Sequence, residues 1–184
     1  YMWARYDAIL LAMRARGIGV MVTVTGTPAW ASSTGRWNAT PAAASGSAFI
    51  EALARRYNGS YVRDDGVTLP SIRSISPRNE PNINLLTTPQ CQKRNGRWVP
   101  VSPKAYAALL RASYARIKAV APKMLVVAGD TAGGTGVCKN ATSTVGTFLF
   151  LSELHRELGG GRKMPFDAWA QHMHPVGPPD RAAF

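Results

Sequence analysis

Acidic residues are scarce in this chain of 184 residues. Ten aspartates and glutamates stand against 22 lysines and arginines, which gives a formal net charge of +12 at pH 7. Such an excess of positive charge suggests a nucleic-acid partner. The cations are scattered near the ends of predicted helices, however, with no run of five basic residues and no nucleic-acid-binding motif. We therefore expect no specific nucleic-acid binding, whereas an acidic polysaccharide is equally compatible with the basic surface.

Long apolar runs and metal-ligand clusters are also missing. No stretch of about 20 apolar residues occurs, which excludes a transmembrane helix within this sequence. His172 and His174 are separated by one residue and would share one side of a strand, so joint metal ligation is geometrically possible. No Cys, Asp or Glu follows them at a typical ligand spacing. We expect no metal and no other cofactor.

What the sequence does contain is an alternation of helical and strand patterns. Periodicity predicts helices over residues 3–16, 48–57, 106–120 and 147–158, and strands over 18–24, 71–76, 124–129 and 166–172. Ser47 is a candidate N-cap of the second helix, and the run 18–24 is expected to be buried on both faces, as in a parallel sheet. The apolar face of the first helix would comprise Tyr6, Ile9, Leu10 and Met13. Helix, turn, buried strand and loop follow each other as in a barrel of alternating helices and strands.

The chain is organised around residues 71–82, where a short strand ends in Asn79-Glu80-Pro81-Asn82. Pro81 biases Glu80 away from helical geometry, so its carboxyl lies where the strand stops and a loop begins. In a barrel of this kind, catalytic residues gather at that edge. A plain turn is the alternative, because asparagine and proline are common turn formers.

Asn-Glu-Pro-Asn at the end of a strand resembles the acid/base motif of the clan A glycoside hydrolases, the (β/α)8-barrel retaining glycosidases that include cellulases and mannanases. By position, the resemblance makes Asn79 the residue that binds the sugar 2-hydroxyl and Glu80 the proton donor at the end of the fourth strand. It covers almost the whole chain. Arg78 departs from the pattern, since the family usually has an aromatic residue there.

Two further segments are similar to this family. Pro28-Ala29-Trp30 resembles the end of the third strand, which makes Trp30 a candidate for sugar stacking; the alternative is a tryptophan that covers the top of the core. His172-Met173-His174 resembles a His-x-Tyr pattern at the end of the sixth strand, with His174 in the tyrosine position. The resemblance implies a carbohydrate substrate, with Asn79, Trp30, His172 and His174 as candidate binding residues.

The resemblance also implies a second carboxylate. A retaining glycosidase needs an acid/base and a nucleophile about 5 to 5.5 Å apart. Only Glu80 and Asp130 are predicted at strand ends on the catalytic face, whereas the family's nucleophile is a glutamate at the end of the seventh strand. A complete barrel takes about 250 residues. We therefore expect an α/β fold, a partial (β/α)8 barrel of about strands three to six with their helices. It would form one incomplete domain over residues 1–184, an internal fragment that is inactive by itself.

Residues 83–103 form a long connection after Glu80, which is expected on the catalytic face. Cys91 lies in this connection and Cys138 in the loop after the strand 124–129, so both belong to the same face. Free thiols are usual in the cytosol. The enzymes that this chain resembles are often secreted, and there a disulfide between the two loops is reasonable. We expect secretion and a bridge between Cys91 and Cys138.

A second class of function stays open. A non-catalytic carbohydrate-binding relative would keep Trp30 and the loop aromatics but would have no functional acid/base pair. The sequence downstream of the sixth strand would separate the two possibilities.

Overall fold

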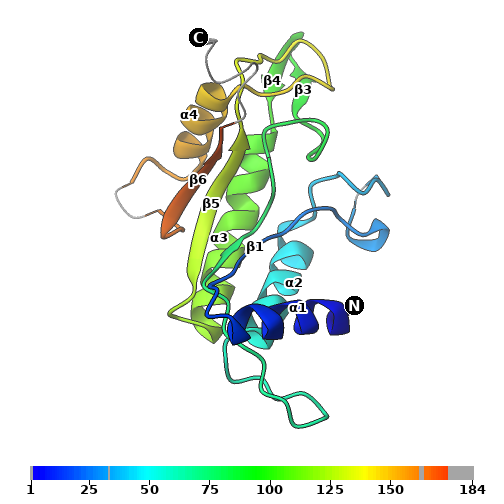
Figure 1. Cartoon of the computed structure of the whole chain (residues 1–184). Helices are drawn as coiled ribbons and strands as arrows, with labels where there is room; N and C mark the ends of the chain where they lie inside the picture. The colour runs from blue at the N-terminus through cyan, green and yellow to red at the C-terminus, as the bar shows by residue number, and fades with distance from the viewer. Residues whose placement is uncertain (1, 33, 162–163, 174–184) are drawn as a thin grey trace, which may run out of the picture.

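A computed structural model describes residues 2–32, 34–161 and 164–173. Its centre is a four-stranded parallel sheet of order β1-β2-β5-β6, formed by Met21–Thr23, Ser74–Ser76, Leu125–Ala132 and Ala168–His172. Because all four strands run in the same direction, their carboxyl ends meet at one edge, toward the top of Figure 1. The chain is therefore an α/β protein with a parallel sheet.

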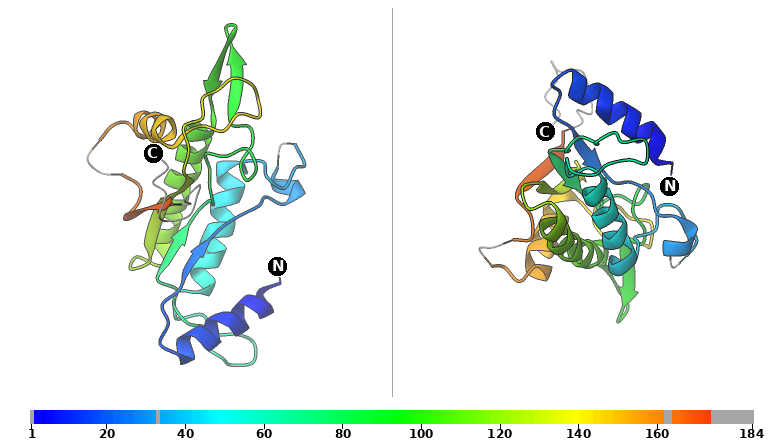
Figure 2. Two further views of the ribbon diagram at one scale, coloured as in Figure 1. Left: turned by 45° about the horizontal axis from the view of Figure 1, so that its top comes forward. Right: turned by 90° about the horizontal axis from the view of Figure 1, so that it is seen from below.

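Four α-helices flank the sheet: α1 Trp3–Ala15, α2 Ala43–Arg56, α3 Ser102–Val120 and α4 Thr147–Glu157. A short 3-10 helix, η1 Ala29–Ala31, follows β1. Figures 1 and 2 show α2, α3 and α4 on one face of the sheet, with α1 beside the edge strand β1. Ile75, Val126 and Ala128 of the sheet point into the core on this face. Among the described residues, no helix is both long and apolar enough to cross a membrane.

The N-terminal elements differ from the prediction in what they bury. The strand expected over 18–24 is reduced to Met21–Thr23, which lies at the edge of the described sheet, and Met21 is 41% exposed. The expectation of a strand buried on both faces is thus wrong. In α1, Tyr6 and Ile9 are exposed, whereas Asp7 and Leu10 are buried. This helix therefore turns a polar residue, and only part of its apolar stripe, toward the protein.

The start of α2 also differs from the prediction. The helix begins at Ala43, after the N-cap residue Ala42, so the proposed cap Ser47 lies in its second turn. Ser47 is buried there, and its hydroxyl donates to the carbonyl oxygen of Ala44. The alanine-rich segment before Ser47 continues the helix because alanine has the highest helix propensity.

A buried ion pair joins α1 to the end of α2. Asp7 is only 1% exposed and accepts two hydrogen bonds from the Arg56 guanidinium, at 2.9 and 2.6 Å. The Tyr57 hydroxyl donates a third bond to Asp7 at 2.8 Å, and Arg63 Nη1 lies 3.8 Å from the carboxylate. The hydrogen bonds from Arg56 hold the pKa of Asp7 below its usual value, and the bond from Tyr57 acts in the same direction. Asp7 thus stays ionised inside the helix layer.

The connection 83–103 contains a β-hairpin that the sequence analysis missed. Strands β3 Cys91–Arg94 and β4 Arg97–Pro100 pair antiparallel around Asn95-Gly96, both with positive φ, as a two-residue hairpin turn requires. The hairpin projects beyond the carboxyl ends of the parallel strands (Figure 1). A disulfide joins Cys91 at its base to Cys138 in the loop after β5.

Reduction of this disulfide should destabilise the protein measurably. The bridge spans 47 residues, a loop for which the chain-entropy model gives a contribution of about 4 kcal/mol. We expect urea unfolding with reductant to show a free energy of unfolding lower by about this amount than without it. The chain contains only two cysteines, so the difference belongs to this bridge. Alkylation of both thiols in unreduced, secreted protein would contradict the prediction.

Candidate functional site

The candidate site centres on a hydrogen-bonded pair, Glu80 and His172. Glu80 follows β2 and His172 ends β6, and His172 Nδ1 lies 2.8 Å from Glu80 Oε1. The side chains are 13% and 31% exposed, so the pair is largely buried but reachable from solvent. Either the ring N–H donates to the carboxylate or the carboxyl O–H donates to the ring nitrogen. In both forms one proton lies between the two groups, which suits a carboxyl that gives and takes protons.

Glu80 is held in an unusual backbone conformation. Its φ of 41° lies in the left-handed region, which residues other than glycine rarely adopt. Its N–H donates to the carbonyl oxygen of Asp130 at 3.0 Å, and the preceding Asn79 N–H donates to Val24 at 2.8 Å. The segment is thereby anchored to both neighbouring parts of the sheet. Backbone strain of this kind is concentrated at functional sites, so its position here supports a role for Glu80.

Asn82 fixes the loop on the other side of Pro81. Its side chain is fully buried and donates to the carbonyl oxygens of Ala132 and Val145, while its side-chain oxygen accepts the N–H of Ala132. The two bonds to Ala132 tie the loop after Glu80 to the end of β5, and the third joins it to the segment before α4. Asn79, by contrast, is half-buried, and its side chain makes no hydrogen bond to the described residues. It is therefore available to a ligand.

Asp130 is the second carboxyl at this edge of the sheet. It also has a left-handed backbone, with a φ of 44°, and lies at a register shift between β5 and β6. Its neighbour Gly129 must be glycine, since a Cβ there would lie 2.3 Å from the carbonyl oxygen of Ala170. Asp130 is 2% exposed and accepts a 3.0 Å hydrogen bond from the Thr23 hydroxyl. Its carboxylate thus connects β1 to β5, and little of it is open to a substrate.

Arg78, where the resembled family has an aromatic residue, is a buried cation that sequence reasoning did not assign. It is 1% exposed, and among the described residues no carboxylate lies within ion-pair distance of it. Burial lowers the pKa of Arg78 to about 10. Its guanidinium donates instead to neutral oxygens, namely the carbonyls of Gly26, Asn38, Ala39 and Leu86 and the hydroxyls of Thr27 and Thr87. Arg78 therefore joins the loop after β1 to the loop after Glu80.

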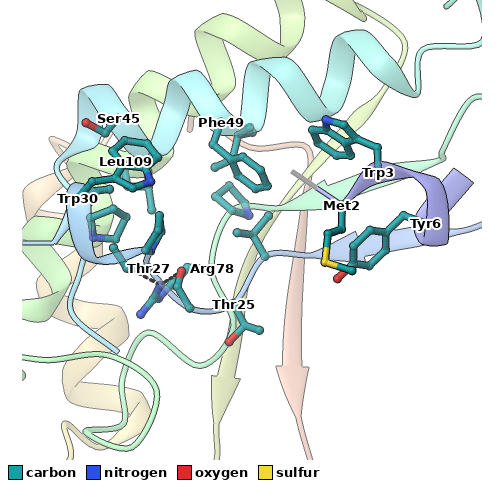
Figure 3. Close-up of a pocket in the computed structure, with 18 residues that line it drawn as sticks. Met2, Trp3, Tyr6, Thr25, Thr27, Trp30, Ser45, Phe49, Arg78 and Leu109 are labelled. Carbon is teal, nitrogen blue, oxygen red and sulfur yellow. Dashed lines mark hydrogen bonds between the residues drawn. The ribbon is translucent and has the colours of Figure 1, made fainter. Parts of the chain in front are cut away.

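Trp30 lies in a different place from the Glu80–His172 pair. It lines an apolar pocket of about 540 Å³ together with Trp3 and Phe49, and Figure 3 shows Arg78 and Thr27 bonded at its floor. Neither Glu80 nor His172 lines this pocket. Trp30 is 69% exposed, so it does not cover the top of the core. Its ring is open to solvent and can stack with a ligand.

The remaining candidates concern His174 and metals. His174 lies outside the described residues. Within residues 2–32, 34–161 and 164–173, no three His, Cys, Asp or Glu side chains are grouped so that they could hold a metal ion. The hydrogen bond from His172 Nδ1 joins the ring to the Glu80 carboxyl.

Proteins similar to this chain were found by comparing structures but not by comparing sequences. No family model and no curated protein matches this sequence. Similar solved structures include the Ignisphaera aggregans GH53 catalytic domain, at 16% identity and a TM-score of 0.49, over 92% of this chain and 41% of that chain. A monomeric beta-xylosidase from Caulobacter crescentus CB15 (15%, TM-score 0.48) and the GH39 enzyme from Xanthomonas axonopodis pv. citri (15%, 0.46) each match 95% of this chain. The match covers 42% of the beta-xylosidase chain and 41% of the GH39 chain, so this chain spans about two fifths of the length of these structures.

Proposed function

We propose that this chain is part of a retaining glycoside hydrolase that cleaves O-glycosidic bonds in a β-linked oligo- or polysaccharide, with Glu80 as the acid/base. The observation that carries the proposal is the Glu80–His172 hydrogen bond of 2.8 Å at the carboxyl ends of two parallel strands. The strained backbone of Glu80 supports it. Our interpretation of the curved helix layer around the four parallel strands (Figure 2) is a partial (β/α)8 barrel, strands three to six, formed by one incomplete domain.

In this mechanism, Glu80 first gives its proton to the glycosidic oxygen while the bond from that oxygen to the anomeric carbon breaks. A carboxylate nucleophile attacks the anomeric carbon and forms a glycosyl ester. Glu80, now a carboxylate, takes a proton from water as the water oxygen attacks the same carbon and releases the ester. His172 hydrogen-bonds the carboxyl through both steps and so positions it.

We do not assign the role of nucleophile to either of the two described carboxyls at this edge of the sheet, Glu80 and Asp130. Asp130 is bonded to Thr23 and is 2% exposed, so we place the nucleophile on a carboxylate outside these four strands. Asn79, whose side chain is available to a ligand, is proposed to bind the sugar hydroxyl next to the reacting carbon. On this assignment the nucleophile lies outside residues 1–184, and we expect these residues to bind sugars without hydrolysing them.

Binding of a cationic iminosugar to residues 1–184 tests the acid/base assignment. Its ammonium resembles the positive charge that develops on the sugar, so it should pair with the Glu80 carboxylate. We expect calorimetry to show binding that Glu80→Gln weakens by about tenfold or more, with no turnover of aryl β-glycosides. Asp64→Asn, which removes an exposed carboxylate in the 58–69 loop, is the matched control. Equal affinity of wild type and Glu80→Gln would overturn the assignment. Turnover that disappears in Glu80→Ala would place the nucleophile on this chain.

A further inference from the structure

A second groove lies beside the apolar pocket, toward the β3–β4 hairpin. It has a volume of about 560 Å³, and its lining includes Trp30, Pro41, Pro89, Gln92 and Arg94. Trp30, Ala31, Pro41 and Ser45 line both cavities, so the two are continuous around Trp30. A volume of this size suits a small ligand of one or two rings.

The groove combines the aromatic ring of Trp30 with the guanidinium of Arg94 and the amide of Gln92. The Trp30 indole is 69% exposed and offers a flat apolar surface. Gln92 and Arg94 are two residues apart on β3, so both side chains lie on the same side of the strand. Arg94 Nη2 donates to Gln92 Oε1 at 3.4 Å, which orients the two groups relative to each other. The indole of Trp30 and the polar groups of Arg94 and Gln92 together fit a ligand with one apolar face and one anionic group.

The sequence around Arg94 carries no acidic residue, although Arg94 also lines an adjoining cavity that contains Glu153 and Glu157. No aspartate or glutamate occurs from residue 81 to residue 129, whereas Lys93, Arg97 and Lys104 are exposed on or next to the hairpin. Among the described residues no carboxylate lies within ion-pair distance of Arg94. The acidic residues of the adjoining cavity, Glu153 and Glu157, pair with Arg156 instead. The Arg94 guanidinium therefore keeps its charge available to a ligand.

We infer that this groove binds a uronic acid residue of the substrate, with the sugar ring on Trp30 and its carboxylate on Arg94 and Gln92. The inference rests on the proposed glycosidase function and names its substrate class as an acidic β-linked polysaccharide. A planar guanidinium matches a carboxylate with two parallel hydrogen bonds, and the Gln92 amide can donate a further one. Single-stranded nucleic acid would instead use a series of aromatic platforms along a basic track, and this groove has Trp30 alone.

Paired ligands test the inference on residues 1–184. Cellouronate, an oligomer of β-1,4-linked glucuronic acid, and a cello-oligosaccharide of equal length differ only in the carboxylate. We expect calorimetry to show binding of cellouronate about tenfold or more tighter than that of the neutral oligomer. Arg94→Gln should reduce cellouronate to the affinity of the neutral oligomer. Arg94→Lys should give an intermediate affinity, and Trp30→Ala should weaken both ligands.

Controls separate this site from general attraction to a basic protein. Arg5→Gln removes the same charge from an exposed position on α1 that lines neither cavity, and Phe148→Ala removes an exposed ring from α4. Both should bind cellouronate like wild type. Equal affinities for the two oligomers, equal losses in Arg94→Gln and Arg5→Gln, or displacement of cellouronate by single-stranded DNA would each overturn the inference. The result is read from cellouronate binding at the groove and not from turnover or iminosugar binding, so failure of the acid/base assignment leaves it unaffected.

Discussion

Exchanging Glu80 for glutamine in a full-length enzyme that contains this chain is expected to lower kcat for β-glycosides with poor leaving groups by about 10²- to 10⁴-fold. Glutamine has nearly the same shape but cannot give a proton to the departing oxygen. A dinitrophenyl leaving group needs no such proton, so formation of its glycosyl-enzyme should be slowed far less. Steady-state kinetics with a series of aryl β-glycosides measures this dependence on the leaving group.

Hydrolysis of the glycosyl-enzyme, the second step of the reaction, gives a second test of Glu80. In Glu80→Ala, water must attack the glycosyl-enzyme without a base, so this step should limit turnover of activated substrates. Azide is already an anion and needs no base, so it should restore the rate and give a glycosyl azide of retained configuration. Asp64→Asn should behave like wild type, because Asp64 is an exposed residue of the 58–69 loop.

The results that would contradict this role are equally specific. Equal rate losses across all leaving groups would show that Glu80 acts by holding the site together and not as an acid. Wild-type protein that binds β-linked sugars but shows no hydrolysis, even at full length, would favour the non-catalytic carbohydrate-binding relative. The Trp30 groove would then be the functional part of the molecule, because its binding role does not need the Glu80 carboxyl.

The sequence predicted the elements whose signals are local. Apolar periodicity located the two C-terminal helices, and α3 Ser102–Val120 and α4 Thr147–Glu157 confirm them. The prolines around residues 71–82 indicated where β2 ends, because they restrict the backbone directly. The resemblance to known enzymes placed Glu80 and His172 at the ends of different strands, and the structure joins them by a hydrogen bond. An Asn-Gly turn at residues 95–96 is also a local signal, and it would have revealed the hairpin.

Features that depend on contacts between distant segments could not be predicted. Arg78 is buried because two loops, around residues 26–39 and 86–87, surround it with carbonyl and hydroxyl oxygens. Nothing in the residues next to Arg78 indicates this shell of acceptors. Asp7 likewise lies on a helix where the sequence predicts a solvent-exposed side chain. Its burial is favourable only because Arg56, 49 residues later in the sequence, forms hydrogen bonds with its carboxylate. In both cases the partner, and not the residue itself, decides the environment.

The Asp7 cluster gives the largest stability effect that we expect from a single substitution. Asp7→Asn should lower the free energy of unfolding by about 3 kcal/mol, since it leaves the Arg56 guanidinium without its counter-charge in a nearly buried position. We place the value at the lower end for such pairs because the side chains of Arg56 and Arg63 are 14% and 29% exposed. Urea unfolding at neutral pH, followed by circular dichroism, measures the difference. Asp65→Asn removes an exposed carboxylate that also pairs with Arg63, and it should leave the unfolding midpoint nearly unchanged.

The pH dependence of the same experiment separates the charge of Asp7 from its shape. Hydrogen bonds from Arg56 and Tyr57 lower the pKa of Asp7 in the folded protein, so the unfolded chain binds the proton more readily. The stabilisation is therefore complete above the unfolded pKa of about 3.9 and is lost as the pH falls toward the lower folded value. The gap between wild type and Asp7→Asn should accordingly narrow as the pH is lowered through this range. A gap that stays constant down to acidic pH would show that Asp7 stabilises by packing and neutral hydrogen bonds, and that its charge contributes nothing to the joint between α1 and α2.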